Sequence, residues 1–163
     1  MLDSIEAQMF QRPENLDSLL VKVDTTNMTQ LEEARISMIK GYIHYKNREY
    51  DKSIKASEIA ETIFSNHKDY YHQNINHLIK AFTFELLSLD DYAAKLYVES
   101  RNYFEKNHLE KFKFYASLGI LRLSNDLNIH KDDRDNLNCL STISKLVNNV
   151  IIRHRQIGYG LLH

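Results

Sequence analysis

Histidine is the residue type in this chain best suited to metal binding or proton transfer, and the sequence contains 8 histidines. His67, His72 and His77 recur at intervals of five residues. A five-residue step turns an α-helix by about 140°, which spreads these side chains around the helix. Metal pairs on helices use spacings of three or four residues. The spacing therefore predicts no metal site and no cofactor, and we expect the histidines to be solvated or to cap helices.

Other residues that could bind metal or act as nucleophiles also lack the partners that such chemistry needs. Asp132, Asp133 and Asp135 resemble the start of a calcium loop, but the glycine and the distal glutamate of such a loop are missing. Acidic residues at a helix N-terminus are expected from the helix dipole alone. Cys139, the only cysteine, lies on the apolar side of a predicted helix, where a buried and inert thiol is expected. With no glycine-rich phosphate loop and no Gly-x-Ser-x-Gly motif, the sequence predicts a protein that is not an enzyme.

The charge pattern and the hydropathy narrow the classes of partner. The formal net charge is −1, and basic residues are interspersed with acidic ones, so no nucleic acid is expected to bind this domain. No apolar run approaches the ~18 residues that span a bilayer, which predicts no membrane insertion. The N-terminus has no basic and then apolar signal pattern. A cytoplasmic location is the default expectation, and a periplasmic one is the alternative if a signal segment was removed.

The elements that must position any binding residues are predicted to be long helices. With 4 glycines and 1 proline, the chain has few residues that favour turns. Thr29 and Glu32 have the spacing of a capping box, which starts a helix over 29–46. Asp69 can cap a helix over 70–88. Further helices are predicted at 3–10, 14–23, 50–65, 90–106, 109–124 and 132–155, which gives an all-α fold of about 7–8 helices.

Small residues recur at matched positions along these helices. Gly41, followed by Tyr50, Ser53 and Ala60, resembles a tetratricopeptide repeat, in which small residues let paired helices cross closely. Ala93 and Ser100 follow Ala81 at the same intervals, 12 and 19 residues, and a third unit is predicted to begin near Gly119. The resemblance implies a right-handed superhelix of antiparallel helix pairs, a TPR-like α-α solenoid.

The predicted organisation is a single domain over 1–163. Residues 1–27 form N-terminal capping helices, and the helix pairs occupy 29–67, 70–107 and 109–156. The residue pattern of positions 2–24 also resembles the start of the repeat region in bacterial TPR sensor and regulator proteins. This resemblance implies a non-catalytic scaffold that binds a protein or peptide segment within a bacterial regulatory protein.

The resemblance places the ligand or partner groove on the first helix of each pair. The predicted lining residues are Met38, Tyr42, Tyr45, Lys46, Leu78, Phe82, Glu85 and Ile120. The family's carboxylate-gripping version has asparagine one turn before the lysine, where this chain has Tyr42 before Lys46. An apolar segment anchored by Tyr42, Tyr45 and Phe82 is therefore expected. The aliphatic members of the set could instead be buried in the core, and this alternative stays open.

Two other functions remain as alternatives. Some bacterial helical-repeat regulators act on a response-regulator partner in a phosphatase-like manner, for which Gln8, Gln11 and Glu14 would be the available side chains. The chain could also be a structural homo-oligomer. The wide apolar stripe of the last predicted helix gives a candidate homodimer interface at Val147, Ile151 and Ile152.

Overall fold

In the computed structural model, residues 1–10 and 15–126 are described. The chain divides into two compact units, residues 1–119 and 120–163. The fold and the site below belong to the first unit unless stated otherwise. Seven helices occupy the described residues: α1 (Leu2–Met9), α2 (Leu16–Leu20), α3 (Gln30–Lys46), α4 (Tyr50–Asn66), α5 (Tyr70–Leu86), α6 (Asp90–Lys106) and α7 (Glu110–Asp126). They include no strand, so the prediction of an all-α fold is confirmed for this part of the chain.

The five helices from α3 onward follow a regular spacing. Each has 17 residues, and their first residues lie 20 positions apart. The connections end each helix in the same way, with a non-glycine residue at positive φ: Arg48, Lys68, Ser88 and His108. A left-handed residue after a helix lets the next backbone N–H bond back to a free carbonyl. The Glu49 N–H, for example, donates to the carbonyl of His44 over 2.9 Å.

The start of α3 confirms the predicted capping box. The Thr29 hydroxyl accepts a hydrogen bond from the Glu32 N–H, and the Glu32 carboxylate accepts one from the Thr29 N–H at 2.9 Å. Asp69 caps α5 as predicted, because its carboxylate accepts the His72 N–H at 3.2 Å. These caps satisfy N–H groups that have no partner within the helix.

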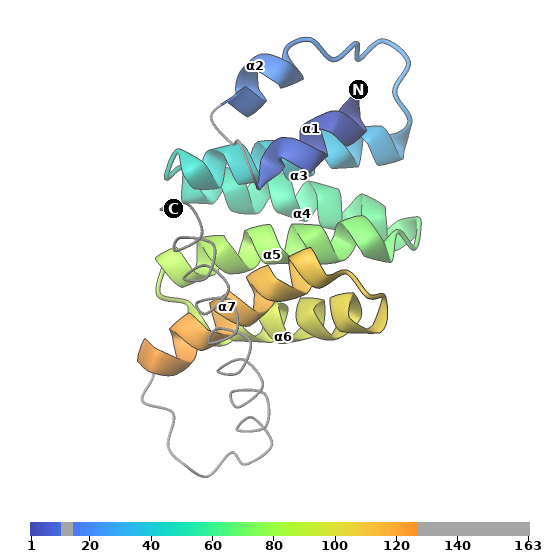
Figure 1. Ribbon diagram of the computed structural model, residues 1–163. Coiled ribbons are helices and arrows are strands. Elements are labelled where there is room, and N and C mark those ends of the chain that lie inside the picture. The colour runs from blue at the N-terminus through green and yellow to red at the C-terminus, as the bar shows by residue number, and fades with distance from the viewer. Residues whose placement is uncertain (11–14, 127–163) are drawn as a thin grey trace, which may run out of the picture. The chain divides into compact units, whose positions relative to one another are not determined.

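Helices that follow one another in sequence pack against one another from α3 to α6, as the side-by-side ribbons in Figure 1 show. The short connections make consecutive helices antiparallel. Helix α3 also contacts α5, and α1 packs on α3. The largest fully buried side chains include Tyr97, Phe64, Phe104, Met38, Ile39, Leu78 and Ile79.

Small residues let these helices approach, but the third contact differs from the prediction. A Cβ atom at Gly41 would lie 2.8 Å from the Ser57 hydroxyl oxygen on α4. One at Gly119 would lie 2.3 Å from the Cζ atom of Tyr97, which stands 40 residues after Ser57. The regular spacing of the helices makes Leu121, and not Gly119, the counterpart of Gly41 and Ala81. Gly119 instead makes room for the fully buried Tyr97 ring.

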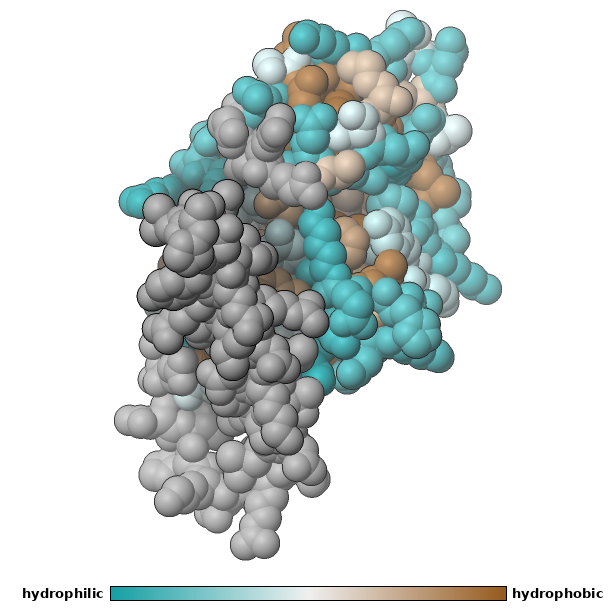
Figure 2. All heavy atoms as spheres, in the orientation of Figure 1, coloured by the Kyte–Doolittle hydropathy of each residue, from teal (hydrophilic) through white to brown (hydrophobic). Residues whose placement is uncertain are grey.

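The visible surface in Figure 2 is mostly hydrophilic and is interrupted by small hydrophobic patches. Exposed apolar side chains include Val21 on the connection after α2 and Tyr92 on α6. Among the described helices, none has the length and apolar character needed to cross a membrane.

Candidate functional site

Aromatic side chains from α3, α5 and α7 gather into one cluster. The Tyr42 and Tyr45 ring centroids lie 5.8 Å apart, and those of Tyr45 and Phe82 lie 5.6 Å apart. These three residues are the anchors predicted from the sequence, and the structure brings them together. Phe112 and Tyr115 of α7 complete what we call the aromatic patch, defined as Tyr42, Tyr45, Phe82, Phe112 and Tyr115.

The centre of the aromatic patch is taken by Phe10, which directly follows α1. Its ring centroid lies 5.1 Å from that of Tyr42 and 6.3 Å from that of Phe82. On α7, it lies 5.9 Å from Phe112 and stacks on Tyr115 at 5.2 Å. One side chain from the N-terminal segment thus contacts α3, α5 and α7. Each such aromatic pair contributes about 0.5–1.5 kcal/mol beyond its buried area.

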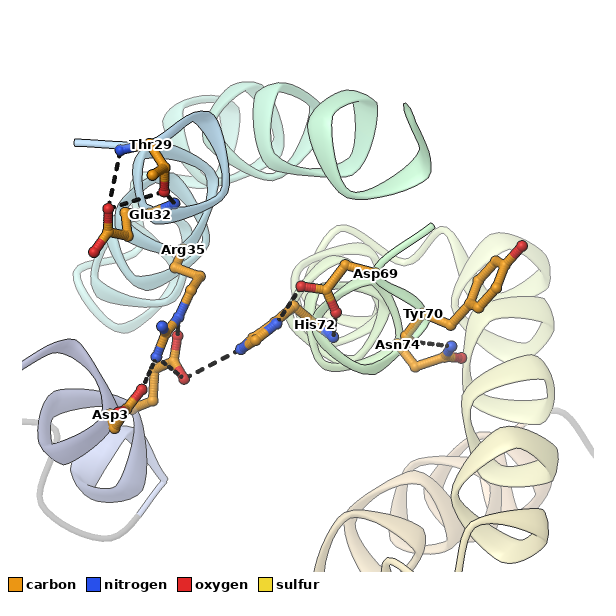
Figure 3. Close-up of polar contacts among 9 residues, drawn as sticks. Asp3, Thr29, Glu32, Arg35, Asp69, Tyr70, His72 and Asn74 are labelled. Atoms are coloured by element: carbon orange, nitrogen blue, oxygen red, sulfur yellow. Dashed lines mark hydrogen bonds and ion pairs between the residues drawn. The ribbon is translucent and has the colours of Figure 1, made fainter. Parts of the chain in front are cut away.

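The first turns of α1 are held by a separate ion-pair network of Asp3, Glu6, Arg35, Asp69 and His72. Arg35 of α3 donates to Glu6 through Nε at 2.6 Å and through Nη2 at 2.9 Å, and it also donates to Asp3. The His72 imidazole of α5 lies between two carboxylates, with Nδ1 2.7 Å from Asp69 and Nε2 3.4 Å from Glu6. Figure 3 shows Arg35 and His72 reaching from their helices toward α1. The network therefore ties α1 to both α3 and α5.

Burial makes these charged contacts matter. Only 15–17% of the Glu6, Arg35 and His72 side chains is exposed. Burial alone would raise the pKa of Glu6, but hydrogen bonds from His72 and Arg35 outweigh it and hold that pKa below its ordinary value. Burial alone would lower the pKa of His72, but the carboxylates of Glu6 and Asp69 outweigh it and raise that pKa. The fold thus favours the charged form of both partners.

The contacts of His72 suit it to hold α1 in place and not to take a proton from a nucleophile. Both of its ring nitrogens face carboxylates, so neither faces a hydroxyl or thiol that it could deprotonate. The other two histidines of the sequence triplet lie elsewhere: His67 Nε2 is 3.0 Å from Gln30 Oε1, and His77 Nε2 is 3.2 Å from Glu61 Oε1. His67 is exposed and is the C-cap residue of α4, as expected of histidines that are solvated or cap helices. His72 and His77 are half-buried and paired with carboxylates, which differs from that expectation.

The remaining predicted groove residues are placed less uniformly. Met38 and Leu78 are fully buried, which favours the alternative that these aliphatic side chains belong to the core. Lys46 is exposed at the end of α3. Glu85 accepts a hydrogen bond from the Tyr97 hydroxyl at 2.5 Å and so helps to fix α6 on α5. Ile120 is half-buried in the part of α7 that belongs to the second unit.

Some predictions fall outside the described residues, and some contacts were not predicted. The predicted interface residues Val147, Ile151 and Ile152 lie outside the described residues, as does the predicted helix over 132–155. The predicted site residues did not include Phe10, Glu6 or Arg35. A signal was available, since Arg35 interrupts the apolar stripe of α3 between Leu31 and Met38. A cation in such a stripe calls for an acidic partner.

A cavity of about 320 Å³ remains beside α1. Its lining comes from α1, α3, α5 and α7 and includes Arg35, His72, Lys111 and Phe112. Helix α1 therefore leaves part of the surface on which it packs unfilled.

No protein-family model, no curated protein and no solved structure matches this chain.

Proposed function

We propose that this chain is a non-catalytic scaffold that binds a protein or peptide segment, as the interaction or sensor part of a bacterial regulatory protein. In this proposal α3 to α6 and the start of α7, up to residue 119, form a TPR-like α-α solenoid, with α3, α5 and the start of α7 on its inner side. The regular spacing of the helices and the contact between α3 and α5 support that arrangement.

The observation that carries the proposal is the way in which the aromatic patch receives Phe10. A ring from a different segment is surrounded by rings of α3, α5 and α7. Docking of an aromatic anchor from a helical segment into an apolar surface is a recurring mode of peptide recognition. Aromatic residues also carry much of the binding energy at interfaces.

The surroundings of the patch favour an apolar anchor over a C-terminal carboxylate. Tyr42, one turn before Lys46, is buried, and burial raises the pKa of its hydroxyl to about 12. Its neutral phenol does not supply the amide group that pairs with lysine in the carboxylate-gripping version. Lys46 itself is exposed.

Selection of peptides against the wild-type chain, followed by substitution of Tyr45, tests the proposal. Tyr45 is half-buried and touches both Tyr42 and Phe82. We expect Tyr45→Ala to weaken binding of a selected peptide by about tenfold, equivalent to 1.4 kcal/mol, with little change in melting temperature.

Tyr92→Ala is the matched control, because Tyr92 is a 64% exposed tyrosine on α6. It should leave peptide affinity unchanged. Failure to select any peptide would contradict the proposal, as would equal loss of affinity in both variants. A large drop in melting temperature for Tyr45→Ala would place Tyr45 in the core and not in a binding surface.

A further inference from the structure

Helix α1 is attached to the proposed binding face at both of its ends. The ion-pair network holds Asp3 and Glu6 to Arg35 and His72, and the aromatic patch holds Phe10. Leu2, Ile5 and Met9 of the same helix are buried. The N-terminal segment therefore makes the contacts that a docked amphipathic helix would make.

The spacing of the attachment residues can be written as a recognition pattern. Glu6 follows Asp3 by three residues, and Phe10 follows Glu6 by four. Residues three, four and seven apart lie on the same face of a helix. The pattern is an acid, a second acid one turn later and an aromatic ring one further turn on.

The fit of α1 leaves room for a better ligand. The cavity of about 320 Å³ beside α1 is bordered by the cations Arg35 and Lys111, by His72 and by the ring of Phe112. Packing that leaves a void gives up contacts that a larger side chain would make. A helix of 8 residues is also marginally stable by itself, so it keeps its place through these two attachments and its buried apolar side chains.

We infer that α1 is a built-in competitor on the binding face, and that the partner is an amphipathic helix carrying the same acid, acid and aromatic spacing, which displaces α1 when it binds. This inference rests on the proposed function and names its class of partner. The acids of the partner pair with Arg35 and His72, and its aromatic side chain takes the place of Phe10. A partner residue longer than alanine at the place of Ala7 would extend into the cavity, whose lining includes Ala7.

Occupation of the face by α1 reduces the apparent affinity for any competing helix. The apparent dissociation constant equals the intrinsic one divided by the fraction of molecules whose face is free, so it rises as that fraction falls. Weakening the attachments of α1 raises the free fraction and tightens binding of the competitor.

The test uses the full chain and a peptide of residues 1–10 with a fluorophore at its C-terminus, measured by fluorescence anisotropy. In the chain, Phe10→Ala and Glu6→Gln together loosen α1 at both attachments. We expect this double variant to bind the peptide at least tenfold more tightly than the wild-type chain does. The matched control, Tyr92→Ala with Glu99→Gln, also replaces one aromatic residue by alanine and one glutamate by glutamine, at exposed positions of α6, and should bind as the wild type does.

The peptide has its own control. Phe10→Ala in the peptide should abolish the gain in affinity, because the aromatic anchor is lost. Equal affinity of the double variant and the wild-type chain would overturn the inference, as would equal binding of the two peptides.

A second measurement keeps the inference falsifiable if the double variant does not fold. Hydrogen exchange of the wild-type chain is followed with and without a large excess of the unlabelled peptide. We expect faster exchange at residues 2–9, because α1 is displaced, with no increase in α3 or α5. Binding of the peptide without faster exchange at residues 2–9 would overturn the inference.

Peptide selection against the wild-type chain separates this inference from the proposed function. Peptides that carry the spacing and lose affinity with Tyr45→Ala support both. Peptides that are sensitive to Tyr45→Ala but lack the spacing overturn the inference and leave the proposed function standing. If no selected peptide is sensitive to Tyr45→Ala, the proposed function fails as well.

Discussion

At the scale of single residues, His72 links three helices through charge. It lies on α5 and faces Glu6 of α1, whose carboxylate is shared with Arg35 of α3, while Asp69 at the start of α5 faces its other nitrogen. The Tyr71 ring meets the imidazole edge-on at 5.0 Å, and Phe64 of α4 stacks on it at 5.5 Å. The charged imidazole is the form that satisfies both carboxylates.

We predict that this link makes stability depend on pH. A pKa raised above the unfolded value of 6.5 means that protonated His72 stabilises the fold below about pH 6.5. That contribution is lost as the pH rises through the folded-state pKa of His72. The free energy of unfolding, measured in urea at pH 6 and pH 8.5, should fall more for the wild type than for His72→Gln. An equal fall in the two proteins would show that His72 does not carry the effect.

A second prediction concerns the close approach at Gly119. Alanine is favoured over glycine inside a helix by about 1 kcal/mol, but its Cβ would overlap the buried Tyr97 ring. Overpacking a core costs about 1–3 kcal/mol. Gly119→Ala should therefore lower the free energy of unfolding by about 1 kcal/mol.

Gly41→Ala is the matched control for this prediction, because its new Cβ would meet a serine hydroxyl that can rotate away. It should cost less than Gly119→Ala in the same urea titration. A Gly119→Ala protein that is as stable as Gly41→Ala would contradict the assigned role of Gly119.

The aromatic anchors could be predicted from the sequence, whereas the partners that α1 supplies to Arg35 could not. Tyr42 and Tyr45 are three residues apart on one helix, and Phe82 stands 40 residues after Tyr42, so periodicity alone aligns them. The pairing of Glu6 with Arg35 depends on where α1 docks, and no local pattern determines that position. Met38 and Leu78 show the same limit, because one apolar stripe can face either a groove or a core.

At the scale of elements, the connections combine regular length with unusual composition. Each ends its helix through a residue in the left-handed region, where glycine is normally favoured, yet Arg48, Lys68, Ser88 and His108 stand there. The left-handed conformation costs a non-glycine residue about 1–2 kcal/mol. The chain therefore terminates its helices with residues that are strained at these positions.

We predict that Lys68→Gly stabilises the protein. Relief of the strain at φ 56° outweighs the extra freedom that glycine gives the unfolded chain, with a net gain of about 0.5–1 kcal/mol. The same substitution at the exposed Lys55, inside α4, should instead cost about 1 kcal/mol. A melting temperature that falls for Lys68→Gly would contradict this account of the connections.

The helices themselves could be predicted well from local signals. The capping box at Thr29 and the cap at Asp69 set the starts of α3 and α5, and the structure confirms both. The register of α7 differs from the predicted one, in which Gly119 is the counterpart of Gly41. The small size of Gly119 instead makes room for Tyr97, in a contact between α6 and α7 that the sequence does not reveal.

At the scale of the whole molecule, the described helices from α3 onward form two sets with different roles in the proposed function. The aromatic patch and the attachments of α1 involve α3, α5 and the start of α7, whereas α4 and α6 contribute none of the patch residues. Binding of a segment to this protein should therefore change hydrogen exchange in the first set alone. A single experiment can test this consequence of the proposed function.

The most direct test is hydrogen exchange, followed by mass spectrometry, on the wild-type chain with and without a saturating selected peptide. The account predicts slower exchange at residues 30–46 and 70–86, which contain Tyr42, Tyr45 and Phe82, and unchanged exchange in α4 and α6. Slower exchange confined to α4 and α6 would place the binding surface on the other set of helices and would contradict the central claim.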